Sequence, residues 1–340
     1  MEWKEYRIND LFNIKSGKDT NLDNSNVGTI PFVNSSGVNN GITAYVKKCS
    51  VKISNCITIA RTGSVGSCFY QQGLVGISGN IRALTPKDFI LNKYNANFII
   101  MALRKNIIGN YNYGKILGSE RIARLKILLP ATSSGEPDFK YMEQYIKEMK
   151  QKKILDYIAY ASKRLGEMEY KIVPELKDKK WKEFCIGDIY DIKSGCSLTK
   201  ENMINGNTPF IGASANNNAV TNFVSNTNRS LDKNVVNINF NGSVGEAFYH
   251  PYTALFSGDV KRLHLKDYPD NEYINLFIIT SIKSQKDKYS YGYKFSEKRM
   301  IRQYIKLPVN DAGDPDYEYM EQYIKNMEYD KIIEYMAYIA

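Results

Sequence analysis

Short apolar runs broken by Gly and Asn make up most of each half of the chain, and a longer apolar stretch at helical spacing accompanies them. Runs such as 57–60 (Ile-Thr-Ile-Ala) and 235–238 (Val-Val-Asn-Ile) predict β-strands between tight turns. Helical spacing is found at Tyr94, Phe98, Met101 and Ala102, and again at Tyr273, Phe277 and Thr280. The pattern predicts one mixed α/β globule over 3–130 and another over 181–308, each closed by an apolar segment that ends in Pro.

A stretch that predicts a long helix follows each globule. Pro137-Asp138 and Pro315-Asp316 mark the helix starts, where acidic side chains are favourable. Beyond them apolar residues recur mostly every three or four positions, at Met142, Tyr145, Met149, Ile154, Ile158, Ala161, Leu165, Met168 and Ile172, and at Met320, Tyr323, Met327, Ile332, Met336 and Ile339. The polar stretch 150–153 shifts the phase once, as in an interrupted coiled coil. We expect a first helix of about 33 residues, roughly 50 Å long, that ends at Pro174. It should pair antiparallel with the second helix, or else the seams bind another protein.

The whole pattern occurs twice. Residues 3–6 (Trp-Lys-Glu-Tyr) return as Trp-Lys-Glu-Phe at 181–184, and 141–147 return unchanged as 319–325, at an offset of 178 residues. The offset is 179 around the Gly-Ser-Val-Gly turn, which occupies 63–66 and 242–245. Solenoid repeats are only about 20–50 residues long, so this is a duplicated domain. The predicted organisation is a first domain over 1–133, a spacer helix over 134–178, a second domain over 179–311 and a C-terminal spacer helix over 312–340.

The charge is concentrated in the first half. Residues 1–178 hold 26 Lys and Arg against 16 Asp and Glu, whereas residues 179–340 hold 20 of each, which gives the net charge of +10. An excess of this kind suits a polyanionic partner, although many basic proteins bind no nucleic acid. The five cysteines form no C-x-x-C pair, and no signal peptide or apolar run of about 20 residues occurs. We therefore expect a cytoplasmic protein with reduced cysteines and no membrane partner.

The residues needed for catalysis are missing. The two histidines, His250 and His264, have no counterpart in the first repeat, and no P-loop, nucleophile elbow, clustered zinc ligands or amino-methyltransferase tetrapeptide is found. Pro137-Asp138 with Glu148-Met149-Lys150 resembles a metal-dependent nuclease pattern. Glu148-Met149-Lys150 falls inside the predicted helix, and the second repeat has Asn326-Met327-Glu328 at these positions, so a structural role is favoured. We expect no catalytic residue, no metal and no cofactor in this chain.

Three polar loops in each repeat are candidates for DNA contact. The turns are kept between the repeats while the polar side chains beside them change, as expected for a scaffold that carries a variable reading surface. Asn suits adenine, and Lys or Arg near aromatics suit the DNA backbone, although solvated turns and plain surface charge are the alternatives. The candidates in the first repeat are Asn34, Ser35, Ser36, Asn39, Arg61, Thr62, Ser64, Tyr113, Lys115 and Arg121. Those in the second are Ser214, Asn216, Asn217, Asn239, Asn241, Ser243, Tyr291, Lys294 and Arg299.

At these residues the chain resembles the DNA-specificity (S) subunits of restriction–modification systems, both the type I subunits and the BcgI-like type IIB subunits. The resemblance is carried by Trp-Lys-Glu-x-x-Ile-x-Asp and Ile-Lys-Ser-Gly (3–17 and 181–195), the Pro-Phe loop, Gly-Ser-Val-Gly, Tyr-x-Tyr-Gly and the Pro-Asp helix start, in the same order twice. It implies two target-recognition domains, separated by long helices in an antiparallel coiled coil, that each read half of a bipartite site in double-stranded DNA. It also implies that the helices dock methyltransferase or restriction subunits, which would hold S-adenosylmethionine and Mg. The seam residues expected to bind this partner are Ile158, Leu165, Met168 and Met336.

Two other functions stay open at this point. One is a self-contained DNA-processing enzyme, which the missing catalytic motifs disfavour. The other is a protein–protein adaptor that uses its coiled coil as a scaffold. Binding to random duplex DNA that weakens steeply with salt would separate the resembled function from the adaptor.

Overall fold

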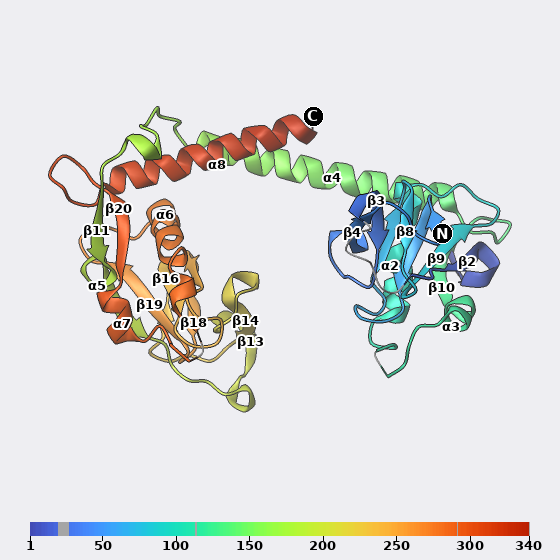
Figure 1. Cartoon of the computed structure of the whole chain (residues 1–340), viewed down its shortest axis with the longest axis horizontal. Helices are drawn as coiled ribbons and strands as arrows, with labels where there is room; N and C mark the ends of the chain where they lie inside the picture. Colours follow the sequence, from blue (N-terminus) through green and yellow to red (C-terminus); the bar gives the residue numbers. More distant parts are fainter. Residues whose placement is uncertain (20–26, 113, 291, 340) are drawn as a thin grey trace. The chain divides into compact units, whose positions relative to one another are not determined.

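The structure, a computed structural model, describes residues 1–19, 27–112, 114–290 and 292–339. The chain divides into two compact units, Met1–Tyr157 and Ile158–Ala340, which Figure 1 colours from blue to green and from green to red. The two units contain the same strands and α-helices in the same order, as the duplication predicts. None of the described helices is long and apolar enough to cross a membrane.

The first unit consists of two four-stranded sheets, a two-stranded ribbon and three short or medium helices ahead of the long one. Its elements are β1 (Glu2–Arg7), α1 (Ile8–Leu11), β2 (Phe12–Ser16), β3 (Val27–Val33), η1 (Asn39–Gly41), β4 (Ile42–Val46), β5 (Lys52–Ile53), β6 (Cys56–Ala60), β7 (Cys68–Gln71), β8 (Val75–Ile77), β9 (Ile81–Pro86), α2 (Lys93–Ile107), α3 (Ser119–Arg124), β10 (Lys126–Ala131) and most of α4 (Phe139–Gly166). The sheet orders are β2-β9-β6-β7 and β4-β3-β8-β5, and β1 pairs with β10.

The second unit repeats this arrangement. Its elements are η2 (Leu176–Asp178), β11 (Trp181–Cys185), α5 (Ile186–Ile189), β12 (Tyr190–Ser194), η3 (Lys200–Asn202), β13 (Asn205–Ile211), η4 (Asn217–Ala219), β14 (Val220–Val224), β15 (Leu231–Asp232), β16 (Val235–Asn239), β17 (Ala247–His250), β18 (Ala254–Phe256), β19 (Val260–Leu265), α6 (Glu272–Lys283), η5 (Lys286–Lys288), α7 (Glu297–Arg302), β20 (Tyr304–Pro308) and α8 (Tyr317–Ile339). The sheet orders are β12-β19-β16-β17 and β14-β13-β18-β15, with β11 paired to β20.

The central strand of each unit is buried along its whole length. All five residues of β6 and all five of β16 are buried. The apolar sides of α2 and α6 are also buried, in the same hydrophobic clusters as residues of these strands. The predicted strands at 57–60 and 235–238, the predicted helices and the proline-ended apolar segments are therefore confirmed as β6, β16, α2, α6, β10 and β20. The mixed α/β fold class is confirmed with them.

The Pro-Asp pairs start the long helices, as predicted. The Asp138 carboxylate accepts a hydrogen bond from the Tyr141 backbone N–H at 2.8 Å, and Asp316 accepts one from the Tyr319 N–H at 3.0 Å. Such a bond satisfies one of the backbone donors that a helix start leaves unpaired. Asp138 is thus a helix cap, and Glu148 lies within α4, which explains the nuclease-like string as structure.

The prediction that the first helix continues to Pro174 is wrong, because α4 ends at Gly166 and residues 168–175 adopt no regular secondary structure. Side chains from one face of α8 hold this segment instead. Asn326 accepts from the Lys171 N–H and donates to the Lys171 carbonyl, at 3.3 and 2.6 Å. Gln322 donates to the Glu169 carbonyl and Tyr319 to the Pro174 carbonyl, at 2.8 and 2.9 Å. These bonds replace those that a longer helix would have made.

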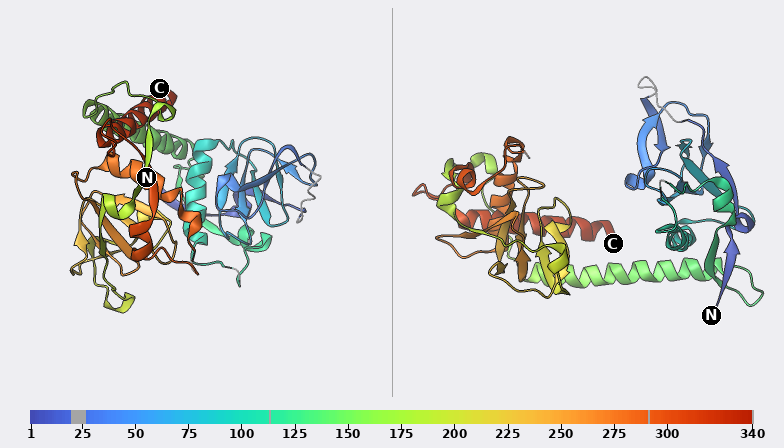
Figure 2. Two further views of the ribbon diagram at one scale, coloured as in Figure 1. Left: turned by 60° about the vertical axis from the view of Figure 1, so that its left-hand side comes forward. Right: turned by 90° about the horizontal axis from the view of Figure 1, so that it is seen from below.

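The end of α4 lies antiparallel to α8 within the second unit (Figure 1; Figure 2). The Arg164 guanidinium binds the Glu328 carboxylate at 2.6 Å, and this pair places Ala161 level with Ile332. Ala161 and Ile332 are both buried, as is Met168 just beyond the helix end. Ile172, predicted to continue the seam, is 97% exposed because it lies in the non-helical segment. The antiparallel pairing is confirmed here, with a seam shorter than the sequence predicts.

We expect Asn326→Ala to lower the free energy of unfolding of the second unit by about 1–3 kcal/mol, because the Lys171 amide loses both partners. Urea denaturation measures this. The control is Glu148→Ala, at the equivalent position of the first repeat, where the side chain is exposed and a change within about 0.5 kcal/mol is expected. Equal effects of the two substitutions would contradict the role assigned to Asn326.

Candidate nucleic-acid interface

Two of the three predicted loops meet in each unit. In the first unit the Ser64 N–H donates to the Ser35 carbonyl at 3.3 Å. In the second, the Ser243 N–H donates to the Ala213 carbonyl at 3.2 Å. Gly63 and Gly242 have φ of +64° and +60°, and a Cβ atom there would come within 3.0 Å of the opposite loop. Only glycine fits at this contact, so the Gly-Ser-Val-Gly turn is kept to bring the loops together.

The backbone explains part of the Asn-rich loop. Asn39 and Asn40 have φ of 51° and 54°, and Asn217 and Asn218 have φ of 52° and 53°. Asn tolerates this left-handed conformation better than most residues. The sequence therefore repeats Asn-Asn in both units for a conformational reason. Asn39 and Asn217 are exposed, as is Asn216, so their side chains are also open to a ligand.

Two of the predicted DNA-contact residues turn inward. The Asn34 side-chain oxygen accepts from the Ser78 hydroxyl at 2.7 Å and from the Ser35 N–H at 2.8 Å. Asn239 is fully buried; it donates to the Ser214 carbonyl at 3.0 Å and accepts from Asn237 at 2.9 Å. Both side chains hold the loop from inside, which favours a bracing role over contact with a base.

The third loop comes next to a short helix in each unit. The Arg121 guanidinium donates to the Ile116 carbonyl and the Arg299 guanidinium to the Lys294 carbonyl, both at 2.6 Å. Lys115 is exposed, with its ammonium 5.1 Å from the centre of the Tyr111 ring. Tyr113 and Tyr291, predicted to contact DNA, lie outside the described residues. The two arginines therefore brace the loop through one hydrogen bond each.

Arg61 and Arg82 come together beside the loop pair of the first unit. The Arg61 N–H donates to the Asn80 carbonyl, next to the start of β9. Arg82 is only 7% exposed; its guanidinium donates to the Ser119 hydroxyl at 2.7 Å and to the carbonyls of Gly79 and Ile81. Burial and the neighbouring Arg61 charge lower the pKa of Arg82. Neither arginine pairs with a carboxylate among the residues that the structure describes.

The second unit neutralises its cations at the corresponding places. Lys261, the counterpart of Arg82, binds the Glu297 carboxylate at 2.6 Å. The Glu246 carboxylate binds both Lys283 and Lys286, at 2.8 and 2.9 Å. These internal pairs fit the equal numbers of acidic and basic residues in residues 179–340.

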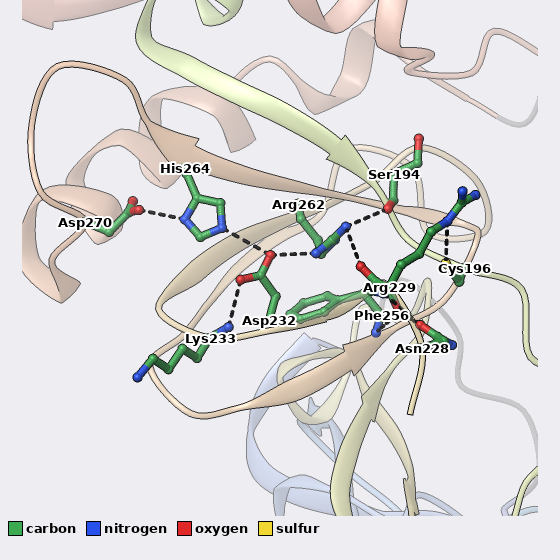
Figure 3. Close-up of polar contacts among 11 residues, drawn as sticks. Ser194, Cys196, Asn228, Arg229, Asp232, Lys233, Phe256, Arg262, His264 and Asp270 are labelled. Atoms are coloured by element: carbon green, nitrogen blue, oxygen red, sulfur yellow. Dashed lines mark hydrogen bonds and ion pairs between the residues drawn. The ribbon is translucent and has the colours of Figure 1, made fainter. Parts of the chain in front are cut away.

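An ionic network of one buried and three half-buried side chains adds to this neutralisation (Figure 3). The Asp232 carboxylate accepts from Arg262 at 2.6 Å and lies 3.2 Å from the His264 ring, whose other nitrogen lies 2.8 Å from Asp270. Bonds to these two carboxylates outweigh burial and raise the pKa of His264. The equivalent positions of the first unit are Ile53, Ala83, Thr85 and Leu91. The network therefore takes the place of mostly apolar packing and leaves Arg262 unavailable to a ligand.

His250 lies in a separate buried network. Its ring nitrogens lie 2.8 Å from the Asn237 side-chain oxygen and 3.1 Å from the Tyr252 hydroxyl. Burial lowers the pKa of His250 to about 4, so the ring is neutral near pH 7. In the first unit Gln71 occupies this position and donates to the Thr58 hydroxyl at 3.1 Å. Because an amide serves equally well there, His250 acts as a buried hydrogen-bonding group.

The sequence analysis missed Arg82, Ser119 and Glu297. A basic residue stands at the same place in both repeats within an otherwise apolar strand, as Arg82 and as Lys261. The repeated basic residue was the signal in the sequence that could have pointed to this position. Ser119 and Glu297 differ chemically, and only the fold shows that they face the two cations.

Comparison with known proteins identifies the family. A family model described as the type I restriction modification DNA specificity domain matches residues 1–158 and again residues 178–334. The chain belongs to this family. DNA specificity, rather than catalysis, is therefore the function of this specificity chain, and its setting is a restriction–modification system. The tandem match also confirms the duplicated organisation.

Two known proteins illustrate the relationship. The type II restriction enzyme specificity subunit S.BcgI of Heyndrickxia coagulans is 38% identical over 331 residues, which cover 96% of this chain and 95% of the relative. The type I restriction-modification S subunit of M. genitalium shares the fold, with a TM-score of 0.56 at 16% identity, over 99% of this chain and 92% of that one. Within the residues that the structure describes, no group of three or more His, Cys, Asp or Glu side chains could hold a metal ion.

We expect the second unit of the specificity chain to lose stability as the pH falls below about 6.5, the pKa of unfolded histidine. His250 has a lower pKa when folded, so the unfolded state binds more protons between about pH 6.5 and pH 4. The loss between pH 7 and pH 5 should be about 2 kcal/mol. The matched variant is His250→Gln, the residue of the first repeat. Urea denaturation gives the free energy of unfolding of both proteins at both pH values. The wild-type value minus the variant value isolates the effect of His250 from that of His264, whose raised pKa acts in the opposite direction. A difference that does not change with pH would contradict the buried neutral state.

Proposed function

We propose that each unit of this specificity chain reads one half of a bipartite site in double-stranded DNA, through the loop pair at the end of its central strand. The meeting of two polar loops on a glycine contact, repeated in both units with different side chains, is the observation that carries this proposal. Base-edge contacts specify sequence, whereas phosphate contacts supply affinity without sequence information. The two loop surfaces differ, so the two half-sites should differ as well.

The exposed and half-buried polar side chains at these loops form the proposed reading surface. In the first unit they are Ser36, Asn39, Arg61, Thr62 and Ser64, and in the second they are Ser214, Asn216, Asn217, Asn241 and Ser243. Ser35, Asn34 and Asn239 support the loops from inside. Lys115, Arg121, Lys294 and Arg299 are proposed to lie against the DNA backbone. The chain domains 1–133 and 179–311 are the proposed reading domains, and 134–178 and 312–340 the spacers.

The helices are proposed to dock the methyltransferase or restriction subunit, which would hold S-adenosylmethionine and Mg. Ile158, Leu165 and Met336 are half-buried and Met168 is buried, so the seam is largely used within the second unit. Met327 and Tyr338 are eleven positions apart, and so on one side of α8, and are 48% and 82% exposed. Apolar side chains exposed in this way on a helix commonly mark a protein interface. We therefore extend the proposed docking surface from the seam to this outer side of α8.

We expect Arg61→Ala to relax base selection in the first half-site only, and Asn241→Ala in the second half-site only. A lost bidentate base contact costs about 1–3 kcal/mol of discrimination. The measurement is selection from a randomised duplex library by the full chain assembled with its methyltransferase-type subunit. Lys115→Ala is the contrasting variant; if it contacts phosphate it weakens all sequences alike and reduces the salt slope by about one. Relaxation of the same base positions by Arg61→Ala and Asn241→Ala would rule out one unit per half-site.

We expect Tyr338→Asp to reduce co-purification of the partner subunit without changing urea denaturation, because the side chain is exposed. The seam variant Ile158→Asp with Leu165→Asp should reduce co-purification too, with a loss of stability because both residues are half-buried. Lys331→Ala is the control, since that side chain is exposed and charged and pairs with neighbouring Glu334. Full yield of the partner with both variants would place the docking surface elsewhere.

A further inference from the structure

The two units also differ in charge around the Gly-Ser-Val-Gly turn. Three carboxylates stand there in the second unit: Glu246, Asp259 and Glu297. Glu246 pairs with lysines, Asp259 accepts from the Asn241 amide at 2.8 Å, and Glu297 pairs with Lys261. Their counterparts in the first unit are the neutral residues Ser67, Asn80 and Ser119. None of these three carboxylates thus has an acidic counterpart in the first unit.

The positive charges change in the opposite direction. The Lys261 ammonium lies 5.3 Å from the centre of the Phe240 ring, and Phe240 is the counterpart of Arg61. Lys261 is thus replaced by Arg82, Glu297 by Ser119 and Phe240 by Arg61 in the first unit. Arg61 is therefore close enough to Arg82 to lower its pKa, and neither side chain has a carboxylate partner among the described residues of the first unit.

Burial makes this pair costly in the absence of a ligand. Only 7% of the surface of Arg82 is exposed, and three hydrogen bonds to uncharged oxygens fix its guanidinium. The Arg61 Nε is buried and has no hydrogen-bond partner among the described residues. A buried donor without a partner is unfavourable, and so is a charge next to a like charge. A negatively polarised hydrogen-bond acceptor from outside the chain would satisfy the unpaired donor and offset the repulsion between the two charges.

We propose that Arg61 and Arg82 form a guanidinium clamp for a negatively polarised acceptor of DNA, either the O6/N7 edge of a guanine or phosphate oxygens, and that Ser119 keeps this clamp open. Guanidinium groups bind both kinds of acceptor through paired N–H donors. In the second unit Glu297 occupies the equivalent place and closes it. The inference rests on the proposed function, since it names the DNA chemistry that the first unit recognises.

The test transfers the closing carboxylate from one unit to the other. Ser119→Glu gives Arg82 the partner that Lys261 has, and Ser119→Gln is the uncharged control of matching size. The full chain is assembled with its methyltransferase-type subunit, and binding to the DNA selected by the wild type is measured between 50 and 200 mM salt. We expect Ser119→Glu to weaken binding about tenfold or more and to keep its thermal stability, whereas Ser119→Gln keeps most of the affinity. Glu297→Ser, the reverse change, should increase the salt dependence of binding.

The form of the loss distinguishes the two acceptors. If the clamp holds guanine, selection with Ser119→Glu loses a guanine at one position of the first half-site. If it holds phosphate, all sequences weaken alike and the salt slope falls by about one. Should Ser119→Glu unfold the first unit, Arg61→Phe, which installs the residue of the second repeat, takes its place with the same expectation.

Unchanged affinity and selection with both Ser119→Glu and Arg61→Phe would overturn the clamp and remove Arg61 from the reading surface, whereas the remaining loop residues and the Asn241→Ala result would still support one unit per half-site. A wild-type assembly that selects no DNA sequence and binds duplex without salt dependence would instead overturn the proposed function itself.

Discussion

The contact between two loop backbones at Gly63, and again at Gly242, is the constraint on which the reading surface of each unit depends. A hydrogen bond from the following serine joins the loops, and no side chain fits between them. In each unit one loop of the pair follows β6 or β16, whose residues are all buried, and the other follows β3 or β13. The polar side chains beside the contact can then change without moving the backbone that presents them.

That separation explains how one duplicated scaffold carries two different surfaces. The core of the first unit is apolar where the second has Arg262, Asp232, His264 and Asp270, yet the strands pair in the same order. As a result, the charge difference between the two halves of the chain can be traced to particular side chains. In the second unit Lys261, Lys283 and Lys286 are paired with carboxylates, and in the first unit Arg61 and Arg82 have no such partner among the described residues. The first unit is therefore suited to electrostatic contact with DNA, and the second to contacts through neutral hydrogen-bonding groups.

The sequence predicts the start of the first long helix correctly but not its end. Apolar spacing from Ile158 to Ile172 predicts one uninterrupted helix, and the structure ends it at Gly166. Local propensity does not decide this, because the deciding groups are Tyr319, Gln322 and Asn326, more than 140 residues away along the chain. They bind the backbone of the segment after α4 and so compensate for the helical hydrogen bonds that it gives up. The same separation in sequence hides the pairing of Arg82 with Ser119 and of Lys261 with Glu297.

The sequence by itself determined the duplication, the α/β class, the helix starts at Asp138 and Asp316, and the loops that carry the polar candidates. Each of these follows from local chemistry: repeated turns, apolar periods and capping residues act over a few positions. The tertiary structure alone decided which polar residues remain open to a ligand. Asn239 and Asn241 are two positions apart, yet one is buried in a brace and the other lies at the surface beside Asp259. Burial and charge compensation depend on groups that only folding brings together, and for that reason the loops were predictable while the roles of their side chains were not.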